Sequence, residues 1–312
     1  MSEDNLPLVT IIVPTYNEEI DIGRTMDALA ALDYPLLEVV VVDDASEDRT
    51  LDIVQQYKGR IPNLRILPQP INRGVAAARN VGLREAQGEI TVILNADVCP
   101  GSDFVRRIVP HYQYSDTDYL VVDARVINDE TIYARYVQAR HVHDQKTVDI
   151  STIHWTEGFS CRRDVALAVG GFPEEFPGAS GEDAVFTEAL AAAGYHRGLD
   201  FSIVVPHIAP ATLREFWKQR LGRGRGGAYR LFAYEKRPLR RWRVLLSIVG
   251  TLMLVALLVP ALRYAWELKE FSPGGKGDWL GLAWAHTVDR VAVALGYWRG
   301  VREIARSNPI KG

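Results

Sequence analysis

Cysteine is scarce in this chain of 312 residues, which contains only Cys99 and Cys161. A small secreted domain that depends on disulfides needs several cysteine pairs, so that class of protein is excluded. The first residues, Met1 to Asn5, include two acidic side chains and lack the basic and apolar regions of a secretory leader. We therefore expect two reduced, packed thiols and no export.

A G-x-G-x-x-G sequence is also missing after the first apolar run, which argues against a dinucleotide-binding fold. Strand and helix signals nevertheless alternate over the first two hundred residues. The predicted strands are Leu8–Val13, Glu38–Val42, Leu64–Leu67, Glu89–Leu94 and Tyr119–Val126, and the predicted helices are Glu19–Leu32, Asp48–Tyr57 with Ser46 as N-cap, Ala76–Ala86, Asp164–Val169 and Ala184–Ala193. This alternation predicts an α/β fold with a mainly parallel sheet.

Charge is unevenly distributed, although the formal net charge is only −3. Residues 213–312 contain 19 Lys and Arg against 7 Asp and Glu. Within this basic region, residues 244–262 form an uncharged run of 19 residues, long enough for a transmembrane helix. Residues 279–298 are apolar except for His286, Asp289 and Arg290, and predict a second crossing or an interfacial helix.

We therefore divide the chain into a catalytic domain, residues 1–212, and a basic linker with a membrane-associated helical hairpin, residues 213–312. Basic clusters outside both apolar segments favour a hairpin with both ends in the cytoplasm. Two alternatives remain open at this point: a buried pair of soluble helices, and an ordinary solvated basic face.

Two predicted strands end in acidic residues. Thr91–Leu94 leads into Asn95-Ala96-Asp97, and Glu38–Val42 leads into Asp43-Asp44. Ligands of open α/β sheets bind beyond the carboxyl ends of the strands, so these side chains predict a site for a nucleotide and its metal. The alternatives are an ordinary turn in the first case and a helix-starting turn in the second.

Several short motifs follow one another in a characteristic order. They are Val13-Pro14-Thr15-Tyr16-Asn17-Glu18, Val42-Asp43-Asp44-Ala45-Ser46, Asn72-Arg73-Gly74 with Ala78-Arg79-Asn80, Asn95-Ala96-Asp97, Gly170-Gly171-Phe172-Pro173 and Gly181-Glu182-Asp183. Together they resemble family 2 glycosyltransferases with the GT-A fold over roughly residues 7–220. The tail resembles membrane-attached bacterial members that build exopolysaccharides or glycolipids.

The resemblance implies a Rossmann-like, mainly parallel central sheet flanked by helices, and a donor that is a nucleotide-diphosphate sugar. It places Pro14, Thr15, Tyr16 and Glu18 in the loop that holds the base. Asp43 would read the uracil or ribose, with Asp44 beside it. Arg73 and Arg79 would offset the diphosphate charge or hold acidic loops.

Asp97, preceded by Asn95 and Ala96, is the expected ligand of Mg²⁺ or Mn²⁺, which prefer carboxylate and phosphate oxygens. Asn95 departs from the family's D-x-D pattern, because a neutral amide replaces the first carboxylate. His207 resembles the late histidine that completes many GT-A metal sites; its alternative is a structural histidine.

Asp183 is the expected catalytic base, with Glu182 as its neighbour. Both open the predicted Ala184–Ala193 helix, whose N-terminus stabilises an anion, so helix capping is the alternative. Arg220 and Arg223 could bind the donor diphosphate, an acceptor phosphate or a membrane surface. No Q-x-x-R-W sequence is present, which favours transfer of single sugars over processive synthesis.

The predicted function is inverting transfer of a sugar to a lipid-linked or glycan acceptor at the cytoplasmic face of the cell membrane, in polysaccharide biosynthesis or on a polyisoprenyl phosphate. We expect membrane lipids as partners and no nucleic acid. The alternatives are a nucleotidyltransferase, which would release pyrophosphate, and a non-catalytic membrane scaffold with the same fold.

Overall fold

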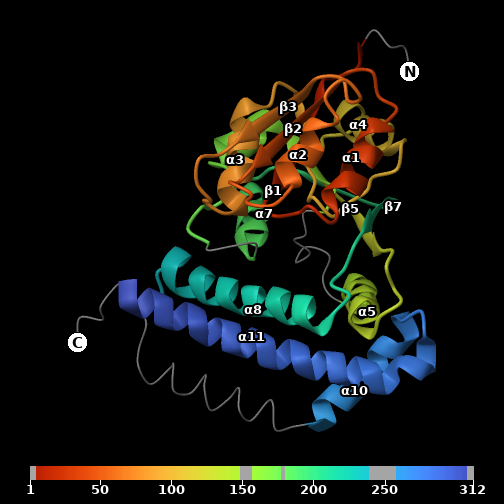
Figure 1. Cartoon of the computed structure of the whole chain (residues 1–312), viewed down its shortest axis with the longest axis vertical. Helices are drawn as coiled ribbons and strands as arrows, with labels where there is room; N and C mark the ends of the chain where they lie inside the picture. Colours follow the sequence, from red (N-terminus) through yellow and green to blue (C-terminus); the bar gives the residue numbers. More distant parts are fainter. Residues whose placement is uncertain (1–4, 148–156, 177–179, 239–257, 308–312) are drawn as a thin grey trace. The chain divides into compact units, whose positions relative to one another are not determined.

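The computed structural model describes residues 5–147, 157–176, 180–238 and 258–307. The chain forms two compact units, whose elements are labelled in Figure 1. The first unit comprises Met1–Arg125, His154–Glu174 and Glu182–His207, and the second comprises Val126–Ile153, Glu175–Gly181 and Ile208–Gly312.

A seven-stranded sheet with the order β3-β2-β1-β4-β6-β5-β7 organises the first unit. Its strands are β1 (Val9–Thr15), β2 (Leu37–Asp43), β3 (Leu64–Pro68), β4 (Ile90–Ile93), β5 (Tyr119–Val126), β6 (Phe159–Arg162) and β7 (Arg197–His207). The first four strands run parallel to one another, whereas β6 pairs antiparallel with both β4 and β5. The predicted α/β class with a mostly parallel sheet is therefore confirmed.

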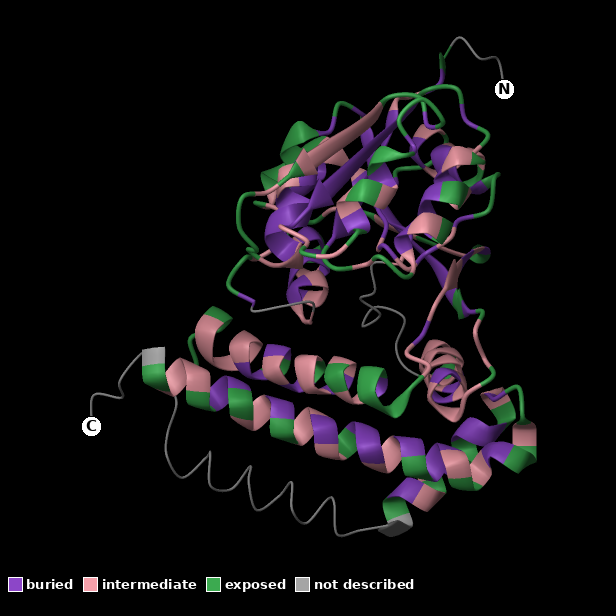
Figure 2. Ribbon diagram, viewed as in Figure 1, coloured by how far each residue is buried: buried purple, intermediate pink, exposed green. Residues whose placement is uncertain are grey.

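Helices cover this sheet: α1 (Ile22–Ala30), α2 (Thr50–Gln55), α3 (Val75–Glu85), α4 (Phe104–Gln113), α6 (Arg163–Ala168) and α7 (Glu182–Ala192). All residues of β1 and β2 are buried, as their continuous β-branched runs predict, and Figure 2 shows these strands in purple. Gly82 of α3 lies so close to Ile12 that a Cβ atom would overlap the isoleucine side chain. Helix α3 therefore packs closely on the sheet.

The strand register sets the position of the acidic strand ends. Thr15 pairs with Asp43 on one side of β1, and Ile12 pairs with Ile93 on the other. Because all three strands are parallel, their carboxyl ends meet at one edge of the sheet. The residues after β2 and after β4 therefore flank the end of β1 on opposite sides.

The predicted N-cap role of Ser46 is wrong. Helix α2 begins at Thr50, whose N–H donates to the Asp48 carboxylate over 2.9 Å. The Ser46 hydroxyl instead accepts the N–H of Asn17 over 3.0 Å. A contact between two loops therefore takes up the side chain that the local sequence pattern assigned to a helix end.

The second unit consists of helices: α5 (Ile132–Thr147), α8 (Leu213–Tyr229) with a π-helical continuation (Arg230–Tyr234), α10 (Leu258–Leu268) and α11 (Trp279–Ser307), with two short 3₁₀ turns at Lys269–Phe271 and Gly275–Asp278. Glycines bring α8 and α11 into backbone contact, because a Cβ atom on Gly224 would overlap the Val293 carbonyl group.

Most of the predicted transmembrane segment, residues 244–262, lies outside the described residues. Among the helices that are described, none combines the length and the apolar character that a membrane crossing requires. Two of the three polar interruptions in α11 contact α5. Asp289 accepts the Tyr136 hydroxyl over 2.8 Å and pairs with Arg140 at 2.8 Å, and His286 lies 3.0 Å from the same hydroxyl. The third, Arg290, is exposed.

Candidate active site

Asp97 lies beside His207 because two distant stretches of the first unit pair here. Val98 forms an antiparallel bridge with His207, and the Cys99 N–H donates to the Pro206 carbonyl oxygen over 3.0 Å. These backbone contacts place His207 Nε2 3.3 Å from Asp97 Oδ2. The other carboxylate oxygen, Oδ1, is buried and has no hydrogen-bond partner within the described part of the chain.

This pair fits a divalent cation. A carboxylate and phosphate oxygens suit Mg²⁺ or Mn²⁺, and a cation at Asp97 would satisfy the buried Oδ1 acceptor. Across residues 5–147, 157–176, 180–238 and 258–307, no cluster of three or more His, Cys, Asp or Glu side chains is arranged to hold a metal. At this point the described chain therefore brings together two candidate ligands, Asp97 and His207.

Asp44 has a structural task at this edge. Its two carboxylate oxygens accept the N–H groups of Arg73 and Gly74 over 2.9 and 2.7 Å. Asp44 is only 2% exposed, so these two hydrogen bonds satisfy the acceptors of a buried carboxylate. The carboxylate thereby fixes the loop that leads into α3, and the Arg73 side chain extends from that loop to pair with Glu174 at 2.7 Å.

Asp43 lies opposite Thr15 in the register and is equally buried. It accepts the Thr15 hydroxyl over 3.3 Å and the Ser46 N–H over 3.1 Å. Tyr16, the residue after Thr15, has 43% of its surface exposed, whereas Pro14, the residue before Thr15, is buried within β1. Asp43 and Thr15 therefore lie side by side at the carboxyl edge of the sheet, where ligands of open α/β sheets bind, and Tyr16 is the next residue along the chain.

Glu18 lies in the loop between β1 and α1. Its N–H donates to the Thr50 hydroxyl over 2.7 Å, and its carbonyl oxygen accepts the N–H groups of Asp21 and Ile22. The preceding residue, Asn17, has a φ of 54°, which turns the chain at this point. The backbone of Glu18 is thus held in place by its neighbours.

Arg79 brings two of the motifs together. Its Nη1 atom donates to Glu182 Oε1 over 2.9 Å, and its Nη2 atom donates to Asn95 Oδ1 over 3.0 Å. Both Arg79 and Glu182 are almost completely buried. Ala96, next to Asn95, is also buried, and its carbonyl oxygen accepts the Thr25 hydroxyl over 2.6 Å.

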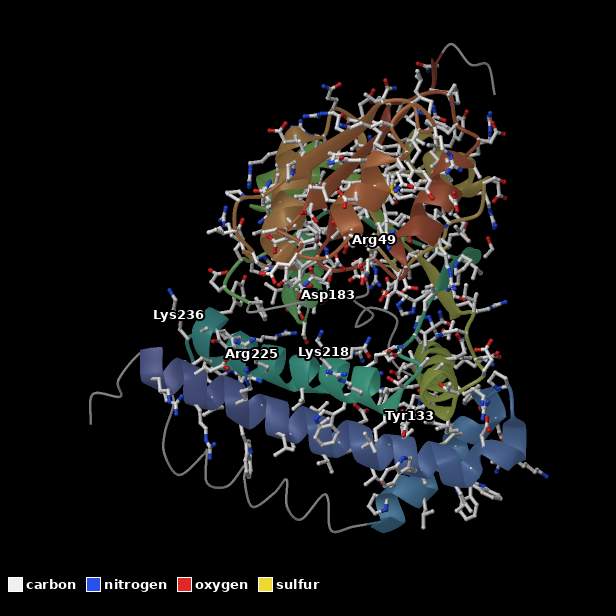
Figure 3. The ribbon with its side chains drawn as sticks, viewed as in Figure 1. Arg49, Tyr133, Asp183, Lys218, Arg225 and Lys236 are labelled. Atoms are coloured by element: carbon white, nitrogen blue, oxygen red, sulfur yellow. The ribbon has the colours of Figure 1, made fainter. Side chains whose placement is uncertain are left out.

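Asp183 lies in the first turn of α7, where it is labelled in Figure 3, and its Oδ1 atom accepts the N–H of Ala184 over 2.8 Å. Burial raises the pKa of this carboxyl to about 7, assisted by the negative charge of Glu182 and opposed by Arg79. The Asp183 carboxyl therefore gains and loses its proton near neutral pH, whereas an ordinary helix-capping aspartate is fully ionised there.

Two residues without a predicted role help to build the site. Asn80 accepts the Phe172 N–H over 2.7 Å and donates to the Phe172 carbonyl oxygen over 2.7 Å. The same amide donates to Glu174 over 2.9 Å. Glu174 thus connects to both α3 and the Arg73 loop. Its position directly after Gly170-Gly171-Phe172-Pro173 was the available sequence signal.

Arg220 and Arg223 belong to the second unit. Arg220 is 1% exposed, lies over the Phe216 ring and has its Nε atom 3.6 Å from Asp289. Burial lowers its pKa to about 9, and the charge of Arg223 contributes to the shift. Arg223 itself is exposed on α8.

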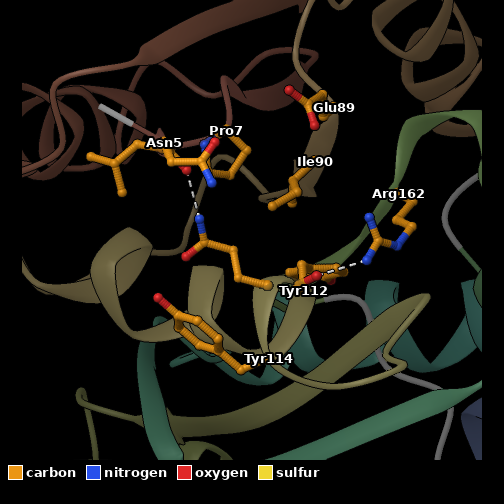
Figure 4. A pocket seen from close by; sticks show the side chains of 9 residues that line it. Asn5, Pro7, Glu89, Ile90, Tyr112, Tyr114 and Arg162 are labelled. Carbon is orange, nitrogen blue, oxygen red and sulfur yellow. Dashed lines mark hydrogen bonds between the residues drawn. The ribbon is translucent and has the colours of Figure 1, made fainter. Parts of the chain in front are cut away.

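A cavity of about 410 Å³ lies elsewhere, at the amino ends of β1 and β4 (Figure 4). Its wall includes Glu89, Tyr112, Tyr114 and Arg162, and none of the predicted site residues. Ligands of such sheets bind at the opposite, carboxyl edge, so we assign no role in the site to this cavity.

Comparison with known proteins identifies the family. Residues 10–167, half of the chain, match the family model for glycosyl transferase family 2. The chain belongs to this family. The family 2 resemblance seen in the motifs is therefore confirmed, and the protein is a glycosyltransferase.

Individual relatives agree with this membership. Glycosyltransferase AglE from Haloferax volcanii is 30% identical over 70% of this chain and 73% of its own length. Beta-monoglucosyldiacylglycerol synthase from Synechocystis is 27% identical, in a match that covers 82% of the present chain and 56% of the synthase. Probable glycosyltransferase YdaM from Bacillus subtilis is 30% identical and is also covered over 56% of its length.

Solved structures share the fold. Mannosyltransferase PcManGT from Pyrobaculum calidifontis, in complex with GDP-Man and Mn²⁺, matches 99% of this chain and 77% of its own with a TM-score of 0.62 and 23% identity. Residues 1–349 of TarS from S. aureus, in complex with UDP-GlcNAc, match 93% of this chain and 91% of their own with a TM-score of 0.54 and 18% identity. The expected GT-A-like fold is thus confirmed.

Proposed function

We propose that this glycosyltransferase moves one sugar from a nucleoside-diphosphate donor to an acceptor hydroxyl, with inversion at the anomeric carbon. The observation that carries the proposal is the link through Arg79. This side chain binds both Asn95 and Glu182. Asp97 lies two residues after Asn95, and Asp183 directly follows Glu182. A candidate cation ligand and a candidate base therefore lie on segments joined by one side chain.

Asp183 is the proposed base. A general base works best when its pKa lies near the working pH, and burial beside Glu182 brings the pKa of Asp183 to about 7. The Glu182 carboxylate is engaged with Arg79 and is less available. In the proposed step, Asp183 takes the proton of the acceptor hydroxyl, whose oxygen forms a bond to the anomeric carbon. The bond from that carbon to the diphosphate breaks on the opposite face.

The remaining residues would bind the donor. Asp43, Thr15 and Tyr16 would hold the nucleoside, and Asp97 with His207 would hold Mn²⁺ or Mg²⁺. The cation, when bound, would neutralise the charge that develops on the departing diphosphate. In support, two proteins of similar fold were solved with GDP-Man and Mn²⁺ and with UDP-GlcNAc.

We further propose a lipid-linked acceptor at the cytoplasmic face of a membrane. The second unit exposes large apolar side chains: Trp266 (54%), Leu280 (67%), Trp284 (54%) and Leu295 (45%). Exposed arginines accompany them at positions 263, 290, 299, 302 and 306. Apolar rings with interspersed positive charge suit an anionic lipid surface. The Synechocystis relative is named for a diacylglycerol glycolipid, beta-monoglucosyldiacylglycerol.

Vesicle binding tests the membrane proposal. The full chain should sediment with phosphatidylcholine vesicles that contain phosphatidylserine, and a Trp266→Ala, Trp284→Ala variant should sediment less. Tyr114→Ala, which removes a 75% exposed ring from the first unit, is the matched control and should sediment like the wild type. Equal sedimentation of all three proteins would reject this proposal.

The released product tests the reaction. The full chain, incubated with a panel of nucleotide sugars, Mn²⁺ and lipid-linked acceptors, should release nucleoside diphosphate in proportion to transferred sugar. Release of pyrophosphate would instead identify a nucleotidyltransferase. Absence of both binding and turnover across the panel would identify a scaffold.

A further inference from the structure

Arg79 joins two motifs that lie far apart in the sequence. It projects from α3 with 3% of its surface exposed, and its guanidinium carbon lies 5.0 Å from the centre of the Phe172 ring. One arm of the planar group binds Glu182 and the other binds Asn95. A rigid fork of this kind fixes the positions of both partners at once.

The bond to Arg79 also determines the orientation of the Asn95 amide. A guanidinium group offers only donors, so the amide atom that faces it must be the oxygen. The Nδ2 group is then the part of Asn95 that remains for a ligand, and it offers donors only. Asp97 is consequently the single carboxylate that the Asn95-Ala96-Asp97 motif can present to a cation.

The other arm of the guanidinium group, Nη1, contacts Glu182, which stands next to Asp183 in the sequence. Glu182 is 2% exposed, and its Oε1 atom lies 2.9 Å from Nη1 of the equally buried Arg79 guanidinium. Among the described residues, the charged groups that act on Asp183 are Glu182 on the same helix, Arg79 on α3 and Glu157 before β6. Any change in the pairing of Arg79 therefore changes the electric field at Asp183.

We propose that Arg79 is a positioning residue that couples the donor side of the site to the base. It holds Asn95 in one orientation and pairs with Glu182, which leaves Asp183 as the member of the Glu182–Asp183 pair that accepts the proton. This inference rests on the proposed function, since it takes Asp183 as the base. It follows that a substitution at Asn95 alters proton transfer at Asp183.

The coupling predicts opposite effects for two nearly isosteric substitutions. Asn95→Asp places a second anion on Arg79, which then neutralises Glu182 less, so the proton affinity of Asp183 rises. Glu182→Gln removes a negative charge while Arg79 keeps its own, so the proton affinity of Asp183 falls. In both cases, the altered group lies outside the expected path of the proton.

The experiment is the pH dependence of kcat/KM for sugar transfer by the full chain with Mn²⁺. The acid limb should move up by about one pH unit in Asn95→Asp and down by about one unit in Glu182→Gln. Glu38→Gln is the matched control, because Glu38 is an equally buried carboxylate that pairs with Arg65 at 3.0 Å at the start of β2. Its acid limb should not move.

The possible outcomes distinguish a failure of the base assignment from a failure of the coupling through Arg79. If Asp183→Asn still transfers sugar, the base assignment and the proposed function are wrong. If Asp183→Asn is inactive but neither acid limb moves, or both move in the same direction, only the coupling through Arg79 is wrong. Should Glu182→Gln fail to fold, Asn95→Asp alone decides: an unmoved acid limb overturns the coupling.

Discussion

The His207 imidazole lies 3.3 Å from the Asp97 carboxylate, although Asp97 follows β4 and His207 ends β7. The Val98–His207 bridge holds the two side chains beside each other. If Asp97 and His207 bind the proposed cation, side chains that already lie together need little reorganisation on binding.

The first prediction concerns this pair. Asp97→Ala should abolish Mn²⁺-dependent binding of nucleoside diphosphate, and His207→Ala should weaken it by about tenfold or more, since each removes one of the two proposed ligands. Calorimetric titration with and without Mn²⁺ measures both. His111→Ala breaks a similar pair, His111–Asp200 at 3.0 Å, and should bind like the wild type. Unchanged Mn²⁺ dependence in Asp97→Ala would exclude the site.

Asp43 and Asp44 should respond differently to the same substitution. Asp44→Asn replaces one acceptor oxygen with an amide that cannot accept the Arg73 or Gly74 N–H, so unfolding should become easier by about 1–3 kcal/mol. Asp43→Asn should instead weaken nucleoside diphosphate binding by about tenfold, with a smaller change in stability. Chemical denaturation and calorimetry separate the two effects. The reverse pattern would mean that the two roles are exchanged.

Adjacent glycines provide a third prediction. Gly170 and Gly171 both have positive φ, 88° and 74°, so alanine costs on the order of 1 kcal/mol at either position. Only at Gly171 would the added Cβ also overlap the Asn80 amide oxygen, which holds Phe172. Gly171→Ala should therefore lower the free energy of unfolding by about 2 kcal/mol more than Gly170→Ala. Equal losses would show that the Asn80 contact is loose.

The raised pKa of Asp183 implies a cost in stability. A carboxyl whose folded pKa is about 7, against an ordinary value of 3.8, loses stability as pH rises between these values, because the unfolded state releases the proton first. Asp183→Asn removes this loss. The variant should melt on the order of 5 °C above the wild type at pH 8, with a difference that shrinks toward pH 4. A pH-independent difference would contradict the shift.

The sequence predicted those parts of the fold where pattern and burial coincide. Strands such as β1 and β2 are buried on both faces, and their β-branched runs are visible without any tertiary information. Strand β6 was missed because it has four residues and pairs antiparallel with strands that lie far from it in the sequence. Ser46 was assigned wrongly because a contact with another loop outweighed its local preference.

Within the site, the sequence predicted the edge of the sheet at which the acidic residues lie, but not which contact each of them makes. Asp43 and Asp44 are chemically identical neighbours, and only the structure shows that one holds the Arg73 loop while the other faces Thr15. Likewise, Glu182 and Asp183 differ through Arg79, whose two partners lie far apart in the sequence. Such distinctions depend on contacts that no local pattern encodes.

Transfer and donor binding by Asp183→Asn provide the most direct test of the proposed reaction. The amide keeps the shape of the side chain but cannot accept the acceptor's proton. Sugar transfer should fall by about 10²–10⁴-fold while the affinity for donor and Mn²⁺ stays within about threefold of the wild type. Transfer at the wild-type rate would contradict Asp183 as the base.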